Sequence, residues 1–141
     1  MKRVKLNTIC SLLSVLMLSG CPQGDRLEPP ESASVSATPN AICFRITTSQ
    51  HYQPVIISIA SRGTPEEERW YADKPDLAIA NGELCIPFAF YPFTENNEFI
   101  VDYVLAPTES VSDRRDYRRV RVGFKIIKGQ AYTVPLKPFE R

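Results

Sequence analysis

The strongest constraint on the fold of this chain is an alternation of apolar and polar side chains with a period of two residues. The clearest run is 119–125, in which Val120, Val122 and Phe124 alternate with polar or small residues. Successive side chains of a strand point to opposite faces of a sheet, so this run predicts a strand with one buried face. The pattern recurs in other short runs, which favours antiparallel sheets. These runs are 42–46, 55–59, 84–90, 99–105 and 132–136.

Turn residues separate the runs. Asn81-Gly82 lies between residues 77–80 and 83–88 and predicts a type I′ hairpin, since both central positions of that turn need a positive φ. Lys128-Gly129-Gln130 predicts a similar hairpin between the last two strands, and Asn96-Asn97 marks another turn.

Residues 64–75 carry a helix-start pattern, Thr64-Pro65, but no apolar stripe follows at helical spacing and Pro75 ends the segment. We expect a loop or one helical turn here, leading into a short strand around Trp70. About seven short strands in about 100 residues, with a single tryptophan, predict an all-β fold. The expected architecture is an immunoglobulin-like antiparallel β-sandwich over residues 41–141.

The N-terminus predicts export. Lys2, Arg3 and Lys5 precede a mostly apolar run, 9–18, and the small residues Ser19-Gly20 follow it. This order is that of a secretory signal, and the apolar run is about half of the roughly 20 residues that a membrane-spanning helix needs. We therefore expect residues 1–20 to be a signal peptide.

The residues Leu18-Ser19-Gly20-Cys21 resemble the lipobox of bacterial lipoprotein precursors. The resemblance implies cleavage before Cys21, lipidation of its thiol and acylation of its new N-terminus. Several acyl chains hold a protein firmly in a bilayer, so the membrane is an expected partner through this anchor. Pro22 stands where lipoproteins retained in the inner membrane typically carry Asp, which favours the outer membrane, facing the periplasm.

Residues 21–40 are rich in Pro, Ser and Glu and contain two large aliphatic residues, Leu27 and Val35. Such a segment buries too little apolar surface to offset its ordering entropy. We expect a lipidated, disordered tether without secondary structure between the membrane and the folded domain.

Two cysteines remain in the expected domain, Cys43 and Cys85, and the two remaining cysteines of an exported protein usually form a disulfide. Each lies between bulky apolar residues of its run, so both side chains should leave the sheet on its minor face. We therefore predict a Cys43–Cys85 bond between adjacent strands of one sheet, nearer the surface than the core, unlike the disulfide of antibody domains. No nearby histidine or cysteine spacing supports a metal site on the pair.

Charge and motif content argue against several classes of function. Without Lys2, Arg3 and Lys5, 14 of the 17 basic side chains remain against 16 acidic ones, which argues against nucleic acid as a partner. The sequence shows no nucleophile elbow, zinc-protease helix or phosphate loop, and its single histidine, His51, lies in a polar link between strands. We expect no enzymatic activity, no cofactor, no metal and no small-molecule substrate.

Two charged segments are candidate partner-facing surfaces, because binding surfaces are usually built on the loops of a rigid sandwich and Arg and Tyr are favoured anchors. One segment is acidic, and the other is basic with an aromatic residue inside it. The alternative is that both are solvated loops that keep the protein soluble. The candidate residues are Glu66, Glu67, Glu68, Arg114, Arg115, Tyr117 and Arg118.

A cluster of four aromatic residues occupies 88–93. Alternation from the preceding strand predicts that Phe88 and Phe90 lie in the core. Tyr91 and Phe93 are then candidates for an exposed binding platform, with ordinary scattered surface residues as the alternative.

Four segments of the chain resemble a known family. They are AICFRI (41–46), RGTP (62–65), NGELCIP (81–87) and FIVDYVL (99–105). Through them the chain resembles small enterobacterial periplasmic lipoproteins described as type VI secretion immunity lipoproteins. The likeness covers nearly the whole mature domain and both of its cysteines, and the residues carried over from the family are Cys21, Cys43 and Cys85. It implies a protein partner, a toxin effector, that the chain neutralises by occlusion. Two alternatives stay open: an envelope structural or assembly accessory that binds a membrane complex or peptidoglycan, and an enzyme.

Overall fold

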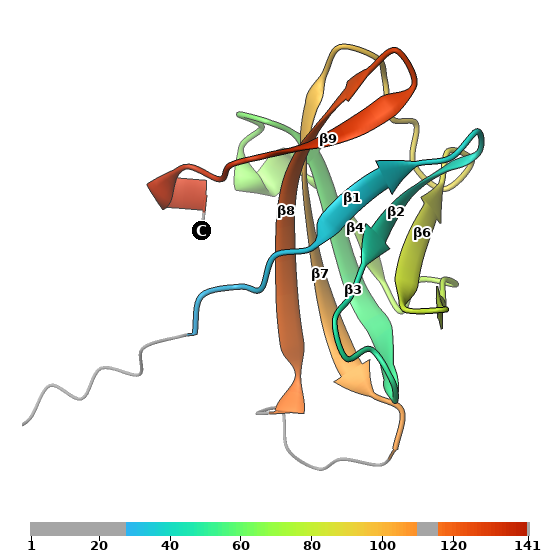
Figure 1. The fold of residues 1–141 in the computed structure, drawn as a ribbon. Helices are drawn as coiled ribbons and strands as arrows, with labels where there is room; N and C mark the ends of the chain where they lie inside the picture. The colour runs from blue at the N-terminus through green and yellow to red at the C-terminus, as the bar shows by residue number, and fades with distance from the viewer. Residues whose placement is uncertain (1–27, 110–115, 141) are drawn as a thin grey trace, which may run out of the picture.

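The computed structural model describes residues 28–109 and 116–140, and in these ranges the chain forms nine strands in two sheets (Figure 1). The strands are β1 (Ser34–Ala37), β2 (Ala41–Arg45), β3 (Tyr52–Ser61), β4 (Trp70–Asp73), β5 (Ile79–Ala80), β6 (Glu83–Pro87), β7 (Glu98–Pro107), β8 (Arg118–Ile127) and β9 (Gln130–Val134). Two 3₁₀ turns, η2 (Glu66–Glu68) and η4 (Pro138–Glu140), follow β3 and β9. Within the described ranges, no helix has the length and apolar character needed to cross a membrane.

The strand order is that of an immunoglobulin-type sandwich. One sheet runs β1-β2-β6-β5 and the other β4-β3-β7-β8-β9, and every pair of neighbouring strands is antiparallel. An immunoglobulin constant domain has the sheets A-B-E-D and C-F-G. The four-stranded sheet matches the first order and β3-β7-β8 the second, with β4 and β9 added at the edges. The predicted fold is confirmed, with nine strands in place of about seven.

The ordered domain begins earlier than the sequence indicated. Strand β1 pairs with β2, and the backbone of Glu31 bridges to β8 at Val120. The expectation that residues 21–40 lack secondary structure is therefore wrong for the part that the structure describes. Val35 and Ala37 pack against the core, and the edge of β2 supplies backbone hydrogen-bond partners, so a weakly apolar segment becomes a strand. The predicted signal peptide, Cys21 and residues 21–27 lie outside the described residues.

The core lies between the inner faces of the two sheets, as the alternating runs predict. Its largest fully buried side chains include Tyr103, Phe44, Phe99 and Phe124. The ring of Phe44 lies edge-on to Phe124 with 5.6 Å between centroids, and Phe99 stacks on Phe124 at 5.7 Å. Such pairs contribute about 0.5–1.5 kcal/mol each beyond the area that they bury.

Both predicted tight turns are confirmed. Asn81 and Gly82 have φ angles of 53° and 77°, and Lys128 and Gly129 have 50° and 72°. Two successive positive φ angles are the requirement of a type I′ turn, whose twist matches the flanking strands. These turns set the register of β5–β6 and of β8–β9.

The aromatic cluster departs from the expected alternation. Strand β6 ends at Pro87, whose carbonyl oxygen accepts hydrogen bonds from the backbone N–H groups of Phe90 and Tyr91, so the chain turns and the period of two is lost. Phe88, expected in the core, is 37 % exposed. Phe93, a candidate for an exposed platform, is partly buried and packs against the core.

The partly buried Trp70 of β4 is the centre of a small aromatic group at the sheet edge. Its indole lies edge-on to Phe90 at 5.1 Å and to Tyr91 at 5.6 Å between centroids. The tryptophan of antibody domains packs against the disulfide that crosses the core. Here it lies on an edge strand instead, which is consistent with the different position of the disulfide.

Cys43 of β2 and Cys85 of β6 form a disulfide between directly opposite residues of adjacent strands, with their Cα atoms 4.0 Å apart. Their neighbours Ile42, Phe44 and Ile86 belong to the core cluster, so alternation places both sulfurs on the outer face of the four-stranded sheet. The predicted bond and its place within one sheet are confirmed. Cys85 is partly exposed, whereas Cys43 is only 3 % exposed, so one half of the bond is buried despite its outer-face position.

Candidate functional site

A strongly charged groove lies on the outer face of the five-stranded sheet, with a volume of about 580 Å³. We call it the outer-face groove. It crosses strands β4, β3, β7 and β8, and the turn η2 forms one wall. Its lining residues are Ile56, Ser58, Glu66, Glu67, Arg69, Tyr71, Asp102, Val104, Arg119 and Arg121.

Asp102 forms the charged floor of the groove, in the middle of β7 and on the side turned away from the core. Its side chain accepts hydrogen bonds from Arg119 Nη2 at 2.6 Å and from Arg121 Nε at 2.8 Å. Arg121 stands directly opposite Asp102 in the sheet register, and Arg119 lies two residues away on the same face. A buried carboxylate without a partner costs several kcal/mol, and these two guanidinium groups offset that cost.

Arg119 links the floor to the acidic wall. The hydrogen bond to Asp102 raises the pKa of Arg119, and the nearby charge of Glu66 acts in the same direction. Even so, the side chain of Arg119 stays 52 % exposed, whereas that of Arg121 is 11 % exposed. Arg119 is therefore held in place and still accessible to a partner.

The acidic wall is formed by η2 together with β4. Glu66 and Glu67 are exposed, and Tyr71 is 57 % exposed beside them. Arg69 lines the same wall, and its buried Nε has no hydrogen-bond partner within the described residues. The groove thus presents acidic, basic and aromatic groups on a sheet surface.

Charged side chains also bind the C-terminal turn η4 to the five-stranded sheet. Arg62 donates to both carboxylate oxygens of Glu140, at 2.9 and 2.6 Å, and to Glu98 at 2.8 Å. The hydrogen bond from Arg62 lowers the pKa of Glu140 to about 2, with a smaller contribution from the backbone N–H of Lys137. Arg121 Nη1 donates to the carbonyl oxygen of Glu140 at 2.8 Å, so the tail is tied to the floor of the groove.

The structure gathers part of the predicted acidic segment into the groove. Glu66 and Glu67 line it, whereas Glu68 is exposed outside it. Arg114 and Arg115 of the predicted basic segment lie outside the described residues.

The two other candidates of the basic segment, Tyr117 and Arg118, differ in their surroundings. Tyr117 is 42 % exposed, so its ring is accessible at the surface. Arg118, a candidate partner-facing residue, instead serves the fold: its guanidinium donates to Glu31 and to the carbonyl oxygens of Thr47 and Thr48. It also lies over the ring of Tyr52, 5.1 Å from the centroid. The hydrogen bond to Glu31 raises the pKa of Arg118.

Sequence reasoning missed Asp102, Arg69 and the two groove arginines as a site. A signal was present, because Asp102 is the one acid inside the apolar run 99–105 and Arg121 the charged residue inside 120–124. Isolated charges on the polar side of a strand are common, however. Only the β7–β8 register brings these two into contact.

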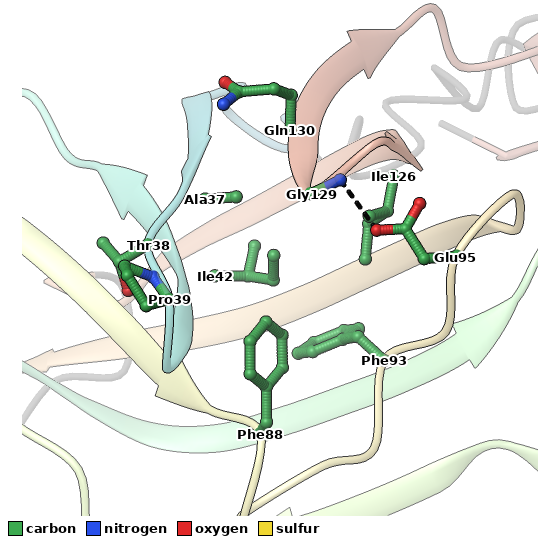
Figure 2. A pocket seen from close by; sticks show the side chains of 10 residues that line it. All are labelled: Ala37, Thr38, Pro39, Ile42, Phe88, Phe93, Glu95, Ile126, Gly129 and Gln130. Carbon is green, nitrogen blue, oxygen red and sulfur yellow. Dashed lines mark hydrogen bonds between the residues drawn. The ribbon is translucent and has the colours of Figure 1, made fainter.

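A second pocket, of about 420 Å³, opens at the end of the sandwich near the β1–β2 and β8–β9 turns (Figure 2). We call it the end socket. It is lined mainly by apolar side chains, and Glu95 and Gln130 stand at its rim. Its lining residues are Ala37, Thr38, Pro39, Ile42, Phe88, Phe93, Glu95, Ile126, Gly129 and Gln130.

The described residues offer little for metal or acid–base chemistry. His51 is exposed in the β2–β3 loop, where its carbonyl oxygen accepts a hydrogen bond from the backbone N–H of Thr108 at 2.7 Å. Cys43, Glu83 and Cys85 lie close together, with their ligand-type atoms within 4.8 Å of one another. Both sulfurs are bonded to each other, and Glu83 pairs with Arg45 at 2.8 Å.

The comparisons with known proteins identify the domain but not its role. No curated protein and no solved structure gives a significant match to the chain. Residues 30–129 match a family described as a domain of unknown function, DUF7480. This match begins just before β1 and ends in the β8–β9 turn, so it spans most of the sandwich. The chain belongs to the DUF7480 family.

Proposed function

We propose that this protein is a periplasm-facing lipoprotein, anchored in the outer membrane through Cys21, that binds and neutralises a type VI secretion effector. The observation that carries the binding role is the outer-face groove, in which an acidic wall, an exposed tyrosine and paired arginines lie together on a sheet. The immunity role rests on the sequence resemblance, and the anchor rests on the lipobox.

The groove suits recognition of a protein because its charged floor is already ordered. Asp102 fixes Arg119 and Arg121 through hydrogen bonds, so these side chains lose little conformational freedom when a partner binds. Tyr71 adds an exposed aromatic anchor of the kind that dominates protein interfaces. Charges of both signs give orientation and speed capture of a complementary surface.

Binding, rather than catalysis, is the proposed chemistry of this groove. Among its lining residues there is no histidine or cysteine, and the carboxylate of Asp102 is taken by two arginines. Inhibition by occlusion needs only a stable surface that covers the active cleft of the effector.

A competition assay tests the role. Deletion of the gene should leave growth in pure culture unchanged and sensitise cells to attack by kin that carry a matching effector. Full protection should return with the wild-type gene. No difference in survival against effector-bearing kin, together with an envelope defect in pure culture, would instead support the accessory role.

A matched pair of tyrosine variants tests the groove. Tyr71→Ala removes a 57 % exposed side chain that lines the groove, and Tyr132→Ala removes a 53 % exposed side chain that does not. We expect the first to weaken effector binding at least tenfold, as hot-spot residues do, and the second to leave it within about twofold. Equal effects of the two substitutions would place the interface elsewhere.

A further inference from the structure

We propose that the end socket is a separate binding site for a basic side chain, lysine or arginine, presented by a polypeptide partner. This site lies at the end of the sandwich and shares no lining residue with the outer-face groove. The inference does not depend on the immunity role, because it rests on the chemistry of the socket alone.

The inner part of the socket is apolar. Ile126 is 5 % exposed and Ile42 is fully buried, so both belong to the core and lie at the bottom of the socket. Phe93 packs against Phe99 and Phe124 with centroid distances of 5.2 and 5.6 Å, which fixes its ring at the wall. A ligand in the socket therefore meets a hydrophobic surface.

The rim carries a carboxylate, and Glu95 is the one charged residue among the ten that line the socket. Its Oε1 accepts a hydrogen bond from the backbone N–H of Gly129 at 2.7 Å, which positions the side chain (Figure 2). Its Oε2 accepts no hydrogen bond from any described residue. A carboxylate that is held in place beside an apolar pocket, with one oxygen free to accept a hydrogen bond, favours a cationic ligand.

The aromatic residues of the socket act in the same direction. Phe88 is 37 % exposed and lies edge-on to Phe93 at 6.4 Å between centroids, so part of its ring is open to a ligand. A cation within about 6 Å of such a ring gains roughly 0.5–1 kcal/mol at an exposed site. Lysine and arginine carry an apolar stem below a charged head, and the stem can pack against the apolar lining of the socket while the head reaches Glu95.

An uncharged apolar side chain fits the same space less well. It would cover the apolar lining but would bring Glu95 into a drier environment without a partner, which costs free energy. An acidic side chain would meet the like charge of Glu95. Thr38 does not alter this preference, because its hydroxyl already exchanges hydrogen bonds with the backbone of Ala41 at 3.1 and 3.0 Å.

The test uses small probes in place of the partner. The full-length protein, labelled at the isoleucine methyl groups, is titrated in detergent with the methylamides of Nα-acetyl-lysine, Nα-acetyl-arginine, Nα-acetyl-norleucine and Nα-acetyl-glutamate. We expect saturable shifts at the methyl groups of Ile42 and Ile126 with the two basic probes. Norleucine, which has a comparable stem without the charge, should bind about tenfold more weakly.

Two variants separate charge from shape. Glu95→Gln keeps an acceptor for the N–H of Gly129 but removes the charge, so the preference for lysine over norleucine should fall from about tenfold to the roughly two- to fivefold that the aromatic ring supplies. Glu28→Gln, an exposed glutamate outside the socket, should leave it unchanged. The proposal is overturned if norleucine binds as tightly as lysine to the wild type, if Glu95→Gln keeps the full tenfold preference, or if no probe gives a saturable shift.

Discussion

Asp102 and Arg121 face each other across the β7–β8 ladder, and the same guanidinium that binds this carboxylate also donates to the carbonyl oxygen of Glu140 in the C-terminal turn. One side chain thus joins the floor of the outer-face groove to the end of the chain. The consequence is that the charged surface proposed to bind a partner also contributes to the stability of the domain. Substitutions there have to be judged by folding as well as by binding.

We expect Asp102→Asn to lower the free energy of unfolding by about 3 kcal/mol, because two arginines lose their carboxylate and the side chain of Arg121 is only 11 % exposed. Urea denaturation of the purified protein measures this change. Arg45→Gln is the control, since the Arg45–Glu83 pair on the other sheet is largely exposed and should be worth less than about 1 kcal/mol. Equal losses in the two variants would contradict a structural role for the Asp102 cluster.

The fold could be predicted from sequence because its determinants are local. Alternation identified the strands that supply the core, and Asn81-Gly82 and Lys128-Gly129 fixed two hairpins. The same alternation placed Cys43 and Cys85 on a shared outer face, and the bond between them followed. Strand β1 was missed because its partner, the edge of β2, is supplied by tertiary structure rather than by its own sequence.

The candidate site could be predicted only in part, because it depends on register and on contacts between distant segments. Glu66 was singled out as part of a charged loop, but its position beside Arg119 comes from the way η2 folds back over the sheet. Arg118 and Arg119 are neighbours in sequence, yet strand alternation sends them to different surroundings. Arg118 donates a hydrogen bond to Glu31, whereas Arg119 lines the outer-face groove.

The disulfide should stabilise the domain without shaping the groove. Cys43 and Cys85 are separated by 42 positions, and closing a loop of that size contributes roughly 4 kcal/mol in the chain-entropy model. We expect Cys43→Ser with Cys85→Ser to lower the free energy of unfolding by about 2–5 kcal/mol while effector binding by the folded protein stays within about twofold. Two free thiols per chain in the non-reduced wild-type protein would refute the bond.

The C-terminal turn should make the stability of the domain sensitive to acid. The pKa of Glu140 is about 2 in the folded protein against an ordinary value of 4.5, so below 4.5 the unfolded chain binds a proton that the folded chain does not. The contribution of Glu140 is therefore full above pH 4.5 and is lost as the pH falls toward 2. Denaturation at pH 6 and pH 3 should show a smaller fall in Glu140→Gln than in the wild type, and identical falls would contradict the prediction.

The lipid anchor should depend on one thiol. Cys21→Ala removes the nucleophile that the lipobox resemblance requires, so the variant should take up no labelled palmitate and should leave the membrane fraction or remain uncleaved. Cys10→Ala is a matched control inside the predicted signal peptide and should be lipidated normally. Equal labelling of the wild type and Cys21→Ala would refute the assignment of the anchor.

The domain should be more stable with phenylalanine in place of Tyr103. Its side chain is fully buried beside Phe44, 5.9 Å between ring centroids, and its hydroxyl has no hydrogen-bond partner within the described residues. Burial raises the pKa of Tyr103, which is the expected result of removing a phenol from water. A buried hydroxyl without a partner costs about 1–3 kcal/mol, whereas the ring of phenylalanine keeps the same packing.

We therefore expect Tyr103→Phe to raise the free energy of unfolding by about 1 kcal/mol, measured by urea denaturation. Tyr52→Phe provides the contrast, because the hydroxyl of Tyr52 donates to the carbonyl oxygen of Asp116 at 3.3 Å and its loss should be neutral or slightly destabilising. A destabilised Tyr103→Phe variant would mean that the hydroxyl has a partner in solution. The sign of the change in the free energy of unfolding therefore shows whether the hydroxyl of Tyr103 destabilises the core or stabilises it through a hydrogen bond.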